Sequence, residues 1–151
     1  MEKAIYFDMD GTIADLYGVK NWYELGMSEN PIIYAVARPM VDTKKVSRLL
    51  NELQEKGYRI GVVSWLWNNG SEKYSKEVRK AKKKWLKENF DVTFDEIHIV
   101  RYGTRKDYIA LQKESFIFDD DIKVRKNWKG VAINPTEFSI EKVLEAILET
   151  A

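Results

Sequence analysis

The sequence has no cysteine, no long apolar run and no excess of charge of either sign. The absence of cysteine excludes a disulfide framework, a thiolate zinc site and a cysteine nucleophile, and it fits a reducing compartment. Because 25 Lys and Arg residues stand against 24 Asp and Glu residues, no overall field favours a nucleic acid or a membrane as the partner. Any electrostatic function must therefore be local.

Signals for export, membrane insertion and repetition are missing as well. The opening residues, MEKAIYFDMD, lack the basic, apolar and small-residue order of a signal peptide, and no apolar stretch is long enough to cross a bilayer. No internal repeat and no low-complexity linker divides the 151 residues, a length that suits one compact domain. We therefore expect a single cytoplasmic domain over residues 1–151, with no membrane partner.

Short apolar runs alternate with amphipathic segments along the chain. The runs predict strands at residues 4–7, 58–64, 96–100, 116–118 and 130–134. Apolar residues at helical spacing predict helices between Asp42 and Gly57, at 72–90, at 105–113 and over the stripe from Ile140 to Leu148. Such alternation is typical of an α/β fold with a mostly parallel sheet and helices on both faces, whose ligands bind beyond the carboxyl ends of the strands.

Polar side chains follow the predicted strands at these carboxyl ends. They are Asp8, Asp10, Ser64, Lys106, Asp119, Asp120 and Asp121. Five of them are carboxylates, which repel one another at low dielectric unless a cation lies among them. Oxygen ligands of this type suit Mg²⁺, which keeps waters or phosphate oxygens in its remaining positions. The sequence therefore predicts a magnesium site at this edge of the sheet.

Four fragments resemble, in order, the motifs of the haloacid dehalogenase (HAD) superfamily. They are DMDGT, the serine of VVSW, the lysine of GTRKDYI and the acidic FIFDDD. Within the superfamily the chain is similar to the 5'(3')-deoxyribonucleotidases through FDMDGTIADLY, ARPMVD, KKKWLKENF and FIFDDD. The resemblance implies a Rossmann-like sheet with the first strand in the centre between the second and the fourth, and with the third and fifth at the edges. It also implies a phosphatase that needs Mg²⁺.

The resemblance assigns roles to the residues at the strand ends. Asp8 would attack phosphorus to form an aspartyl-phosphate, and Asp10 would protonate the leaving oxygen and later accept a proton from water. This division requires unequal pKa values for the two carboxyl groups. Ser64 would donate to phosphoryl oxygens, and Lys106 would offset negative charge, with the adjacent Arg105 as the less favoured candidate for that place.

Metal and substrate ligands follow from the same resemblance. Asp120 is expected to bind Mg²⁺ directly with Asp119 in support, and the run of three aspartates leaves a shift by one residue open. The complete set of expected metal ligands is Asp8, Asp10, Asp119 and Asp120. The residues expected to contact substrate are Gly11, whose backbone allows a tight turn beside the phosphate, Thr12, Trp22, Tyr23 and Trp65.

The segment at about residues 14–38 lies where the superfamily places a cap over the site. It is shorter here than in the deoxyribonucleotidases. Its aromatic side chains could stack on a nucleobase or pack the cap onto the core, and they are Tyr17, Trp22, Tyr23 and Tyr34. Trp65 and Trp67 are expected at the same entrance. A small cap also leaves room for a phosphorylated protein or a polynucleotide end.

The sequence thus predicts a Mg²⁺-dependent phosphomonoester hydrolase that acts on a nucleoside monophosphate or a similar small phosphomonoester. A polynucleotide phosphatase is the alternative enzyme. A regulatory module that keeps the metal and phosphate site without turnover is the alternative of another class. Asp10 favours an enzyme, because a pure binder needs no proton donor on the leaving-group side.

One basic run, RKAKKKW at residues 79–85, is open to two interpretations. It could form a nucleic-acid patch, or it could be the solvated face of a helix. Its charges surround an apolar stripe with Val78, Ala81 and Trp85 at helical spacing, and this favours a solvated outer face.

Overall fold

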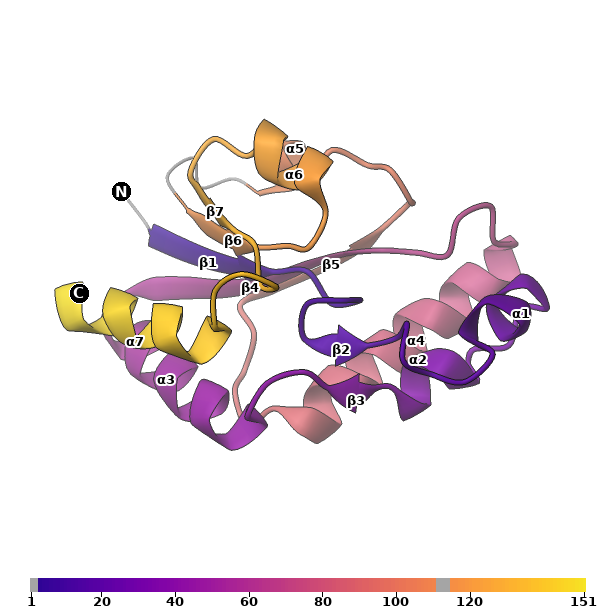
Figure 1. The fold of residues 1–151 in the computed structure, drawn as a ribbon, viewed down its shortest axis with the longest axis horizontal. Coiled ribbons are helices and arrows are strands. Elements are labelled where there is room, and N and C mark those ends of the chain that lie inside the picture. The colour runs from indigo at the N-terminus through magenta and orange to yellow at the C-terminus, as the bar shows by residue number, and fades with distance from the viewer. Residues whose placement is uncertain (1–2, 111–114) are drawn as a thin grey trace.

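A computed structural model describes residues 3–110 and 115–151 of the chain. Within these residues one sheet contains β1 (Lys3–Phe7), β4 (Tyr58–Trp65), β5 (Glu96–Val100), β6 (Phe116–Phe118) and β7 (Val131–Ile133). Its strand order is β5-β4-β1-β6-β7, and every pairing is parallel (Figure 1). The α/β class, the parallel five-stranded sheet and the expected strand order, with β1 in the centre, are confirmed.

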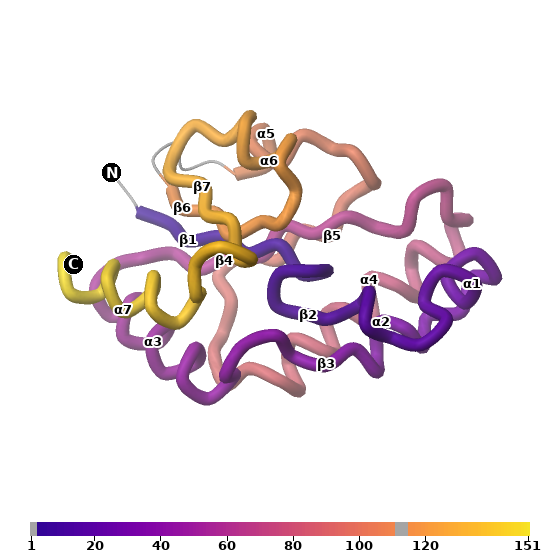
Figure 2. Tube along the Cα trace, viewed as in Figure 1, coloured from indigo at the N-terminus to yellow at the C-terminus, as the bar shows by residue number. Residues whose placement is uncertain are grey.

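Helices cover both faces of the sheet, because successive residues of β1 point to opposite sides. Ile5 and Phe7 pack in a core with α3 (Thr43–Glu55), α4 (Glu72–Asn89) and α7 (Ile140–Thr150). Ala4 and Tyr6 pack on the opposite face in a core that includes Val124 of α6 (Ile122–Asn127). Figures 1 and 2 show α3 beside α7 on one side of the sheet, and α5 (Lys106–Ile109) with α6 on the other.

The observed bounds of the five strands lie within one residue of the predicted ones. Asp42 caps α3, since its side chain accepts a hydrogen bond from the Lys45 amide at 3.1 Å. The helix expected at residues 105–113 is shorter in the structure. It covers Lys106–Ile109, Ala110 is already extended, and residues 111–114 lie outside the described part of the chain.

The segment at residues 14–38, here called the cap segment, contains four short elements. β2 (Ala14–Asp15) pairs antiparallel with β3 (Arg38–Pro39), and α1 (Trp22–Met27) and α2 (Ile32–Val36) lie between them. The two helices lie beside α4, at the end of the molecule opposite the start of β1 and the end of α7 (Figure 1).

The cap segment is anchored to α4 by hydrogen bonds along its length. Glu29 accepts from the amide of Ser71, the residue that caps α4, at 2.8 Å. The Tyr74 hydroxyl donates to the Asn30 carbonyl at 3.0 Å, and Trp85 Nε1 donates to the Ala37 carbonyl at 2.7 Å. The cap is therefore seated on α4, and Ile33 and Tyr34 also share a core with Ile99 of β5. None of the helices in the described ranges has the length and apolar character that a membrane crossing requires.

Candidate active site

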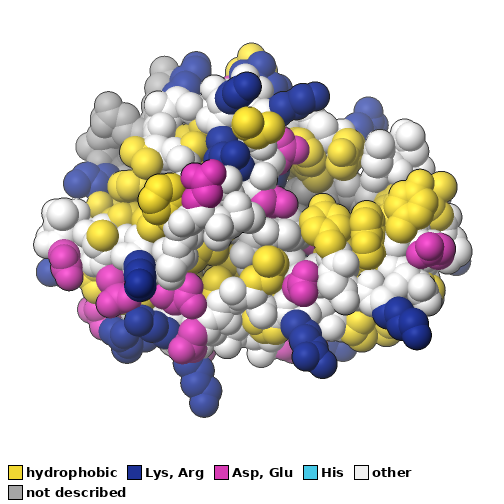
Figure 3. All heavy atoms as spheres, viewed as in Figure 1, with side chains coloured by type: hydrophobic (Ala, Val, Ile, Leu, Met, Phe, Trp, Pro, Cys, Tyr) yellow, Lys and Arg dark blue, Asp and Glu magenta, His cyan; other side chains and the backbone are white. Residues whose placement is uncertain are grey.

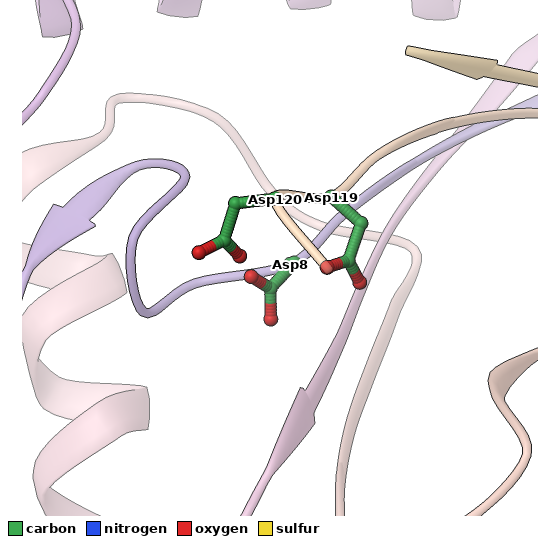
Figure 4. Close-up of side chains that lie close together, drawn as sticks. All are labelled: Asp8, Asp119 and Asp120. Atoms are coloured by element: carbon green, nitrogen blue, oxygen red, sulfur yellow. The ribbon is translucent and has the colours of Figure 1, made fainter. Parts of the chain in front are cut away.

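Three carboxylates come together at the carboxyl ends of β1 and β6. Asp8 follows β1, and Asp119 and Asp120 follow β6; Figure 4 shows their carboxylates directed toward one another. One oxygen from each lies within 4.8 Å of the others. The convergence follows from the pairing of Phe7 with Phe118 in neighbouring parallel strands, which end at the same level.

Lys106 neutralises part of this charge. Its Nζ donates to Asp8 Oδ1 at 2.9 Å and to Asp119 Oδ2 at 2.7 Å, and its side chain is 2% exposed. Burial alone would lower the pKa of Lys106, but the two carboxylates raise it above its usual value, so the ammonium stays charged. Arg105 instead pairs with Asp107 at 2.8 Å. The structure therefore places Lys106, and not Arg105, in the site.

The three carboxylates fit a divalent cation. One buried ammonium cannot balance three carboxylates, and burial followed by the charge of Asp8 raises the pKa of Asp119 and of Asp120. A raised carboxyl pKa means that the anionic form is destabilised, and a bound cation would relieve this. A set of ligands made of carboxylate oxygens is the kind that Mg²⁺ prefers.

Gly11 and Thr12 lie next to the three carboxylates and help to fix their positions. Thr12 is buried, and its Oγ1 donates to Asp8 Oδ2 at 2.9 Å, so Asp8 is held at both oxygens by Thr12 and Lys106. Gly11 has a φ of 80°, and a Cβ there would collide with the carboxylate of Asp120. Both residues were expected to contact substrate. The structure gives Thr12 a supporting position and uses Gly11 to make room for Asp120.

Asp10 lies outside the three-carboxylate group, although it was expected among the metal ligands. Its Oδ2 accepts a hydrogen bond from Lys82 Nζ at 2.9 Å, so the structure does not bring this side chain to the metal position. Burial raises the pKa of Asp10 above its ordinary value, although the charge of Lys82 opposes the shift. A carboxyl group that keeps its proton to higher pH is suited to act as a general acid.

Lys82 was missed in the sequence, because the run at 79–85 was interpreted as a solvated face. Its neighbours Lys83 and Lys84 are indeed exposed, but the Lys82 side chain is only 1% exposed. It lies four residues after Val78 and four before Leu86, both buried, and therefore on the inward face of α4. This spacing was the signal in the sequence that could have identified it.

Two further residues expected in the site, Asp121 and Ser64, form hydrogen bonds with other groups of the protein. The Asp121 carboxylate caps α6 by accepting from the amides of Lys123 at 2.8 Å and Val124 at 3.4 Å. Ser64 is fully buried, and its Oγ accepts from Lys82 Nζ at 2.7 Å. All five expected carboxylates line one pocket, and three of them, Asp8, Asp119 and Asp120, form the close group, while Asp10 and Asp121 have other partners.

We expect Asp120→Ala to raise the Mg²⁺ concentration needed for half-maximal activity, and Asp121→Ala to leave it nearly unchanged. Asp120 belongs to the carboxylate group, whereas Asp121 caps a helix, and loss of a cap costs about 1 kcal/mol of stability. Titration of activity with Mg²⁺ measures the first effect and thermal unfolding the second. If Asp121→Ala raised the Mg²⁺ requirement more than Asp120→Ala does, Asp121 rather than Asp120 would be the metal ligand.

A pocket of about 470 Å³ opens in front of these residues. Asp8, Asp10 and Lys106 lie in its wall, and the remaining wall is largely aromatic. The aromatic residues that line it are Tyr17, Trp22, Tyr23, Tyr34, Trp65, Trp67 and Tyr102. Figure 3 shows apolar side chains gathered over the half of this face that carries the cap segment, with acidic side chains beside them.

The aromatic residues differ in how free they are to meet a ligand. Tyr34 is 4% exposed and packs over the Lys82 ammonium, 5.0 Å from its ring centre. Tyr17 and Tyr23 are 51% and 55% exposed, and Trp22 makes edge contacts with both rings at 4.9 and 5.7 Å. Tyr34 therefore packs the cap onto the core, and the other three present a wall to the pocket.

Trp65 and Trp67 both line the pocket, as expected from their position after Ser64. Trp65 is fixed by a hydrogen bond from its Nε1 to the Thr104 carbonyl at 3.0 Å, and its ring lies 5.0 Å from Tyr102. Trp67 lies against Gly26 of α1, where a Cβ would collide with its ring. Trp65 thus lines the pocket at the end of β4, and Trp67 lines it where the chain contacts α1 of the cap segment.

No protein-family model and no curated protein sequence matches the chain. Among solved structures, the chain is similar to the HAD domain of the effector protein Lem4 from Legionella pneumophila. The identity is 15%, the match covers 98% of this chain and 94% of that chain, and the TM-score is 0.47. This likeness concerns the course of the backbone and says nothing about activity or substrate.

Proposed function

We propose that the chain is a HAD-type phosphatase that hydrolyses phosphomonoesters and requires Mg²⁺. The observation that carries the proposal is the position of Asp8. It is held at both oxygens by Thr12 and Lys106, it belongs to a carboxylate group suited to a cation, and it lines a pocket that also contains Asp10. A nucleophile, a charged lysine and a separate proton donor are the groups that a two-step phosphoryl transfer needs.

The reaction would proceed in two displacements at phosphorus. In the first, an oxygen of Asp8 forms a bond to phosphorus, the bond to the leaving oxygen breaks, and Asp10 gives that oxygen a proton. In the second, Asp10 accepts a proton from water as the water attacks phosphorus and releases Asp8. Lys106 remains charged and offsets the negative charge on Asp8 and on the phosphoryl group. Mg²⁺, held by Asp8, Asp119 and Asp120, would supply further positive charge to the phosphoryl oxygens.

A panel of phosphomonoesters tests this proposal, with released phosphate as the measurement. We expect turnover in the presence of Mg²⁺ and loss of turnover when a chelator removes it. Binding of inorganic phosphate and Mg²⁺ without turnover of any member would instead support the regulatory module. The presence of Asp10 in the pocket wall supports the enzyme, because a binder has no use for a proton donor there.

We further propose that the substrate is a nucleoside monophosphate. Accessible rings of Tyr17, Trp22 and Tyr23 line the same pocket as Asp8, and rings of this kind stack on bases. A polynucleotide end is the alternative substrate. Among the described residues that line the pocket, Lys106 is the only cation, and it is already bonded to two carboxylates. A wall with so little free positive charge disfavours a polyanionic strand.

Tyr23→Ala and Trp22→Ala are expected to reduce kcat/KM for nucleoside monophosphates. Stacking on one base is worth ~1–3 kcal/mol, which corresponds to a loss of up to about a hundredfold. A small aryl phosphate should be turned over nearly as before, because it reaches only the end of the pocket that contains Asp8 and Lys106. If both activities fell in parallel, the rings would serve to pack the cap segment and not to stack on the base.

The unaltered protein offers a second check on the substrate. It should prefer nucleoside monophosphates to ribose 5-phosphate, which carries the same phosphate and no base. Equal turnover of the two would contradict the proposal of a nucleotidase and leave only the proposal of a phosphatase.

A further inference from the structure

We propose that Lys82 is a positioning residue that fixes the orientation of Asp10 for proton transfer to the leaving group. The inference rests on the proposed phosphatase function and adds a residue to it. It starts from a buried lysine whose three hydrogen-bond donors are all used, at Asp10 Oδ2, Ser64 Oγ and the Trp65 carbonyl.

Two of these bonds tie the ammonium to β4. The Nζ of Lys82 lies 2.7 Å from both Ser64 Oγ and the Trp65 carbonyl oxygen, and these atoms belong to adjacent residues of a strand that is paired on both sides, with β5 and β1. An ammonium group has three donors in a tetrahedral arrangement. Once two are directed at β4, the direction of the third is set, and the structure shows it directed at Asp10 Oδ2.

The third bond decides which oxygen of Asp10 is available. Oδ2 is committed to Lys82 at 2.9 Å, while Asp10 as a whole lines the pocket. The other oxygen, Oδ1, is therefore the one that would carry the proton to the leaving group. An Asp10 side chain free to rotate would spend less time in this orientation, and misplacement of a catalytic group by about 1 Å can cost about a hundredfold in rate.

Direct binding of phosphate by Lys82 fits the structure less well. All three of its donors already have acceptors, its side chain is 1% exposed, and it is not among the residues that line the pocket. Lys106 differs because it lines the pocket and its Nζ bonds to two acceptors, Asp8 and Asp119. The two lysines therefore have different roles: Lys106 contacts the nucleophile Asp8, and Lys82 contacts the proton donor Asp10.

The cap segment closes the site of Lys82 from outside. Tyr34 of α2 is buried, and its ring centre lies 5.0 Å from the Lys82 ammonium. The same α4 helix that carries Lys82 also anchors the cap through Tyr74 and Trp85. The seating of the cap and the orientation of Asp10 thus depend on one helix.

The experiment compares Lys82→Met with the wild type on two substrates, p-nitrophenyl phosphate and an alkyl phosphate. Methionine has nearly the length of lysine but no charge and no donor. We expect kcat/KM for the alkyl phosphate to fall by about 10–100-fold, while kcat/KM for p-nitrophenyl phosphate changes little, because kcat/KM reports the first step, in which a good leaving group needs no proton. Lys83→Met, at the exposed neighbouring position on α4, is the matched control and should behave as wild type.

A double variant distinguishes a positioning role of Lys82 from a structural one. It also keeps the proposal testable if Lys82→Met alone does not fold. Asp10→Asn/Lys82→Met removes both members of the buried pair, which is tolerated better than an unpaired partner. If Lys82 acts through Asp10, the double variant should match Asp10→Asn within about threefold on both substrates. A further large loss in the double variant, an equal loss of kcat/KM for both substrates in Lys82→Met, or an effect confined to KM would overturn the proposal. Failure of the wild type to release phosphate from any substrate would instead overturn the proposed function.

Discussion

Asp8→Asn is expected to abolish phosphomonoester hydrolysis while leaving a folded protein. An amide nitrogen and a neutral oxygen cannot form the aspartyl-phosphate, and removal of a nucleophile that works with its neighbours costs at least about 10⁴-fold in kcat/KM. The fold should survive because asparagine has the same shape and Lys106 keeps its bond to Asp119 at 2.7 Å. Phosphate release and thermal unfolding, measured on the same preparation, check the two halves of the prediction.

Wild-type turnover by Asp8→Asn would show that water attacks phosphorus directly, and the covalent mechanism would be wrong. Thr12→Val is a useful companion, because Thr12 donates to Asp8 Oδ2 without reaching the pocket. Its loss should lower the rate far less than the loss of Asp8, since Lys106 still holds the other carboxylate oxygen.

Asp10→Asn is expected to slow the reaction in proportion to the need for a proton on the leaving group. For an alkyl phosphate the loss should be about 10²–10⁴-fold, the usual contribution of general acid catalysis. For p-nitrophenyl phosphate the first step should be nearly unaffected, because its leaving oxygen is stable without a proton. The comparison of kcat/KM for the two substrates measures this difference, since kcat/KM reports the first irreversible step.

Equal losses for the aryl and the alkyl phosphate would be inconsistent with an acid role for Asp10. The raised pKa of Asp10 gives the sign of the expected pH dependence. A carboxyl group whose pKa is raised keeps its proton as pH increases through the ordinary range, so alkyl phosphate turnover should persist to a higher pH than an unperturbed aspartate would allow.

The strands, and the edge of the sheet that carries the candidate site, could be predicted because buried parallel strands have a strong local signature. YRIGVVSW is an almost continuous apolar run with the polar Ser64 one residue before its end, and β4 covers all of it. Asp8 and Asp119 are far apart in the chain, but each ends a strand of this kind. Once the strands are neighbours and parallel, their first polar residues meet.

The cap helices could not be predicted because their stability is not local. α1 and α2 have six and five residues, too few to show an apolar period, and Asn21 starts α1 from a left-handed conformation with no side-chain cap. They are held by contacts with distant residues, such as Trp67 against Gly26 and Tyr74 with Asn30. Such contacts are visible only in the folded chain.

The number of carboxylates that lie close enough together to share a cation was also not readable from the sequence. The sequence shows which acidic residues reach the sheet edge, but not which of them have other partners in the folded chain. Asp121 caps α6, and Asp10 pairs with Lys82. Lys82 itself was hidden in a basic run, because a lysine is normally assigned to the solvent side of a helix. Its burial depends on Asp10 and Ser64, which lie on other elements.

The stereochemical course at phosphorus tests the central claim most directly. The substrate would be a phosphorothioate monoester made chiral with oxygen isotopes, hydrolysed in isotopically labelled water. Each in-line displacement inverts the configuration, so transfer to Asp8 followed by transfer to water should give a product with net retention. Net inversion would mean a single displacement by water and would contradict the role of Asp8 as the nucleophile.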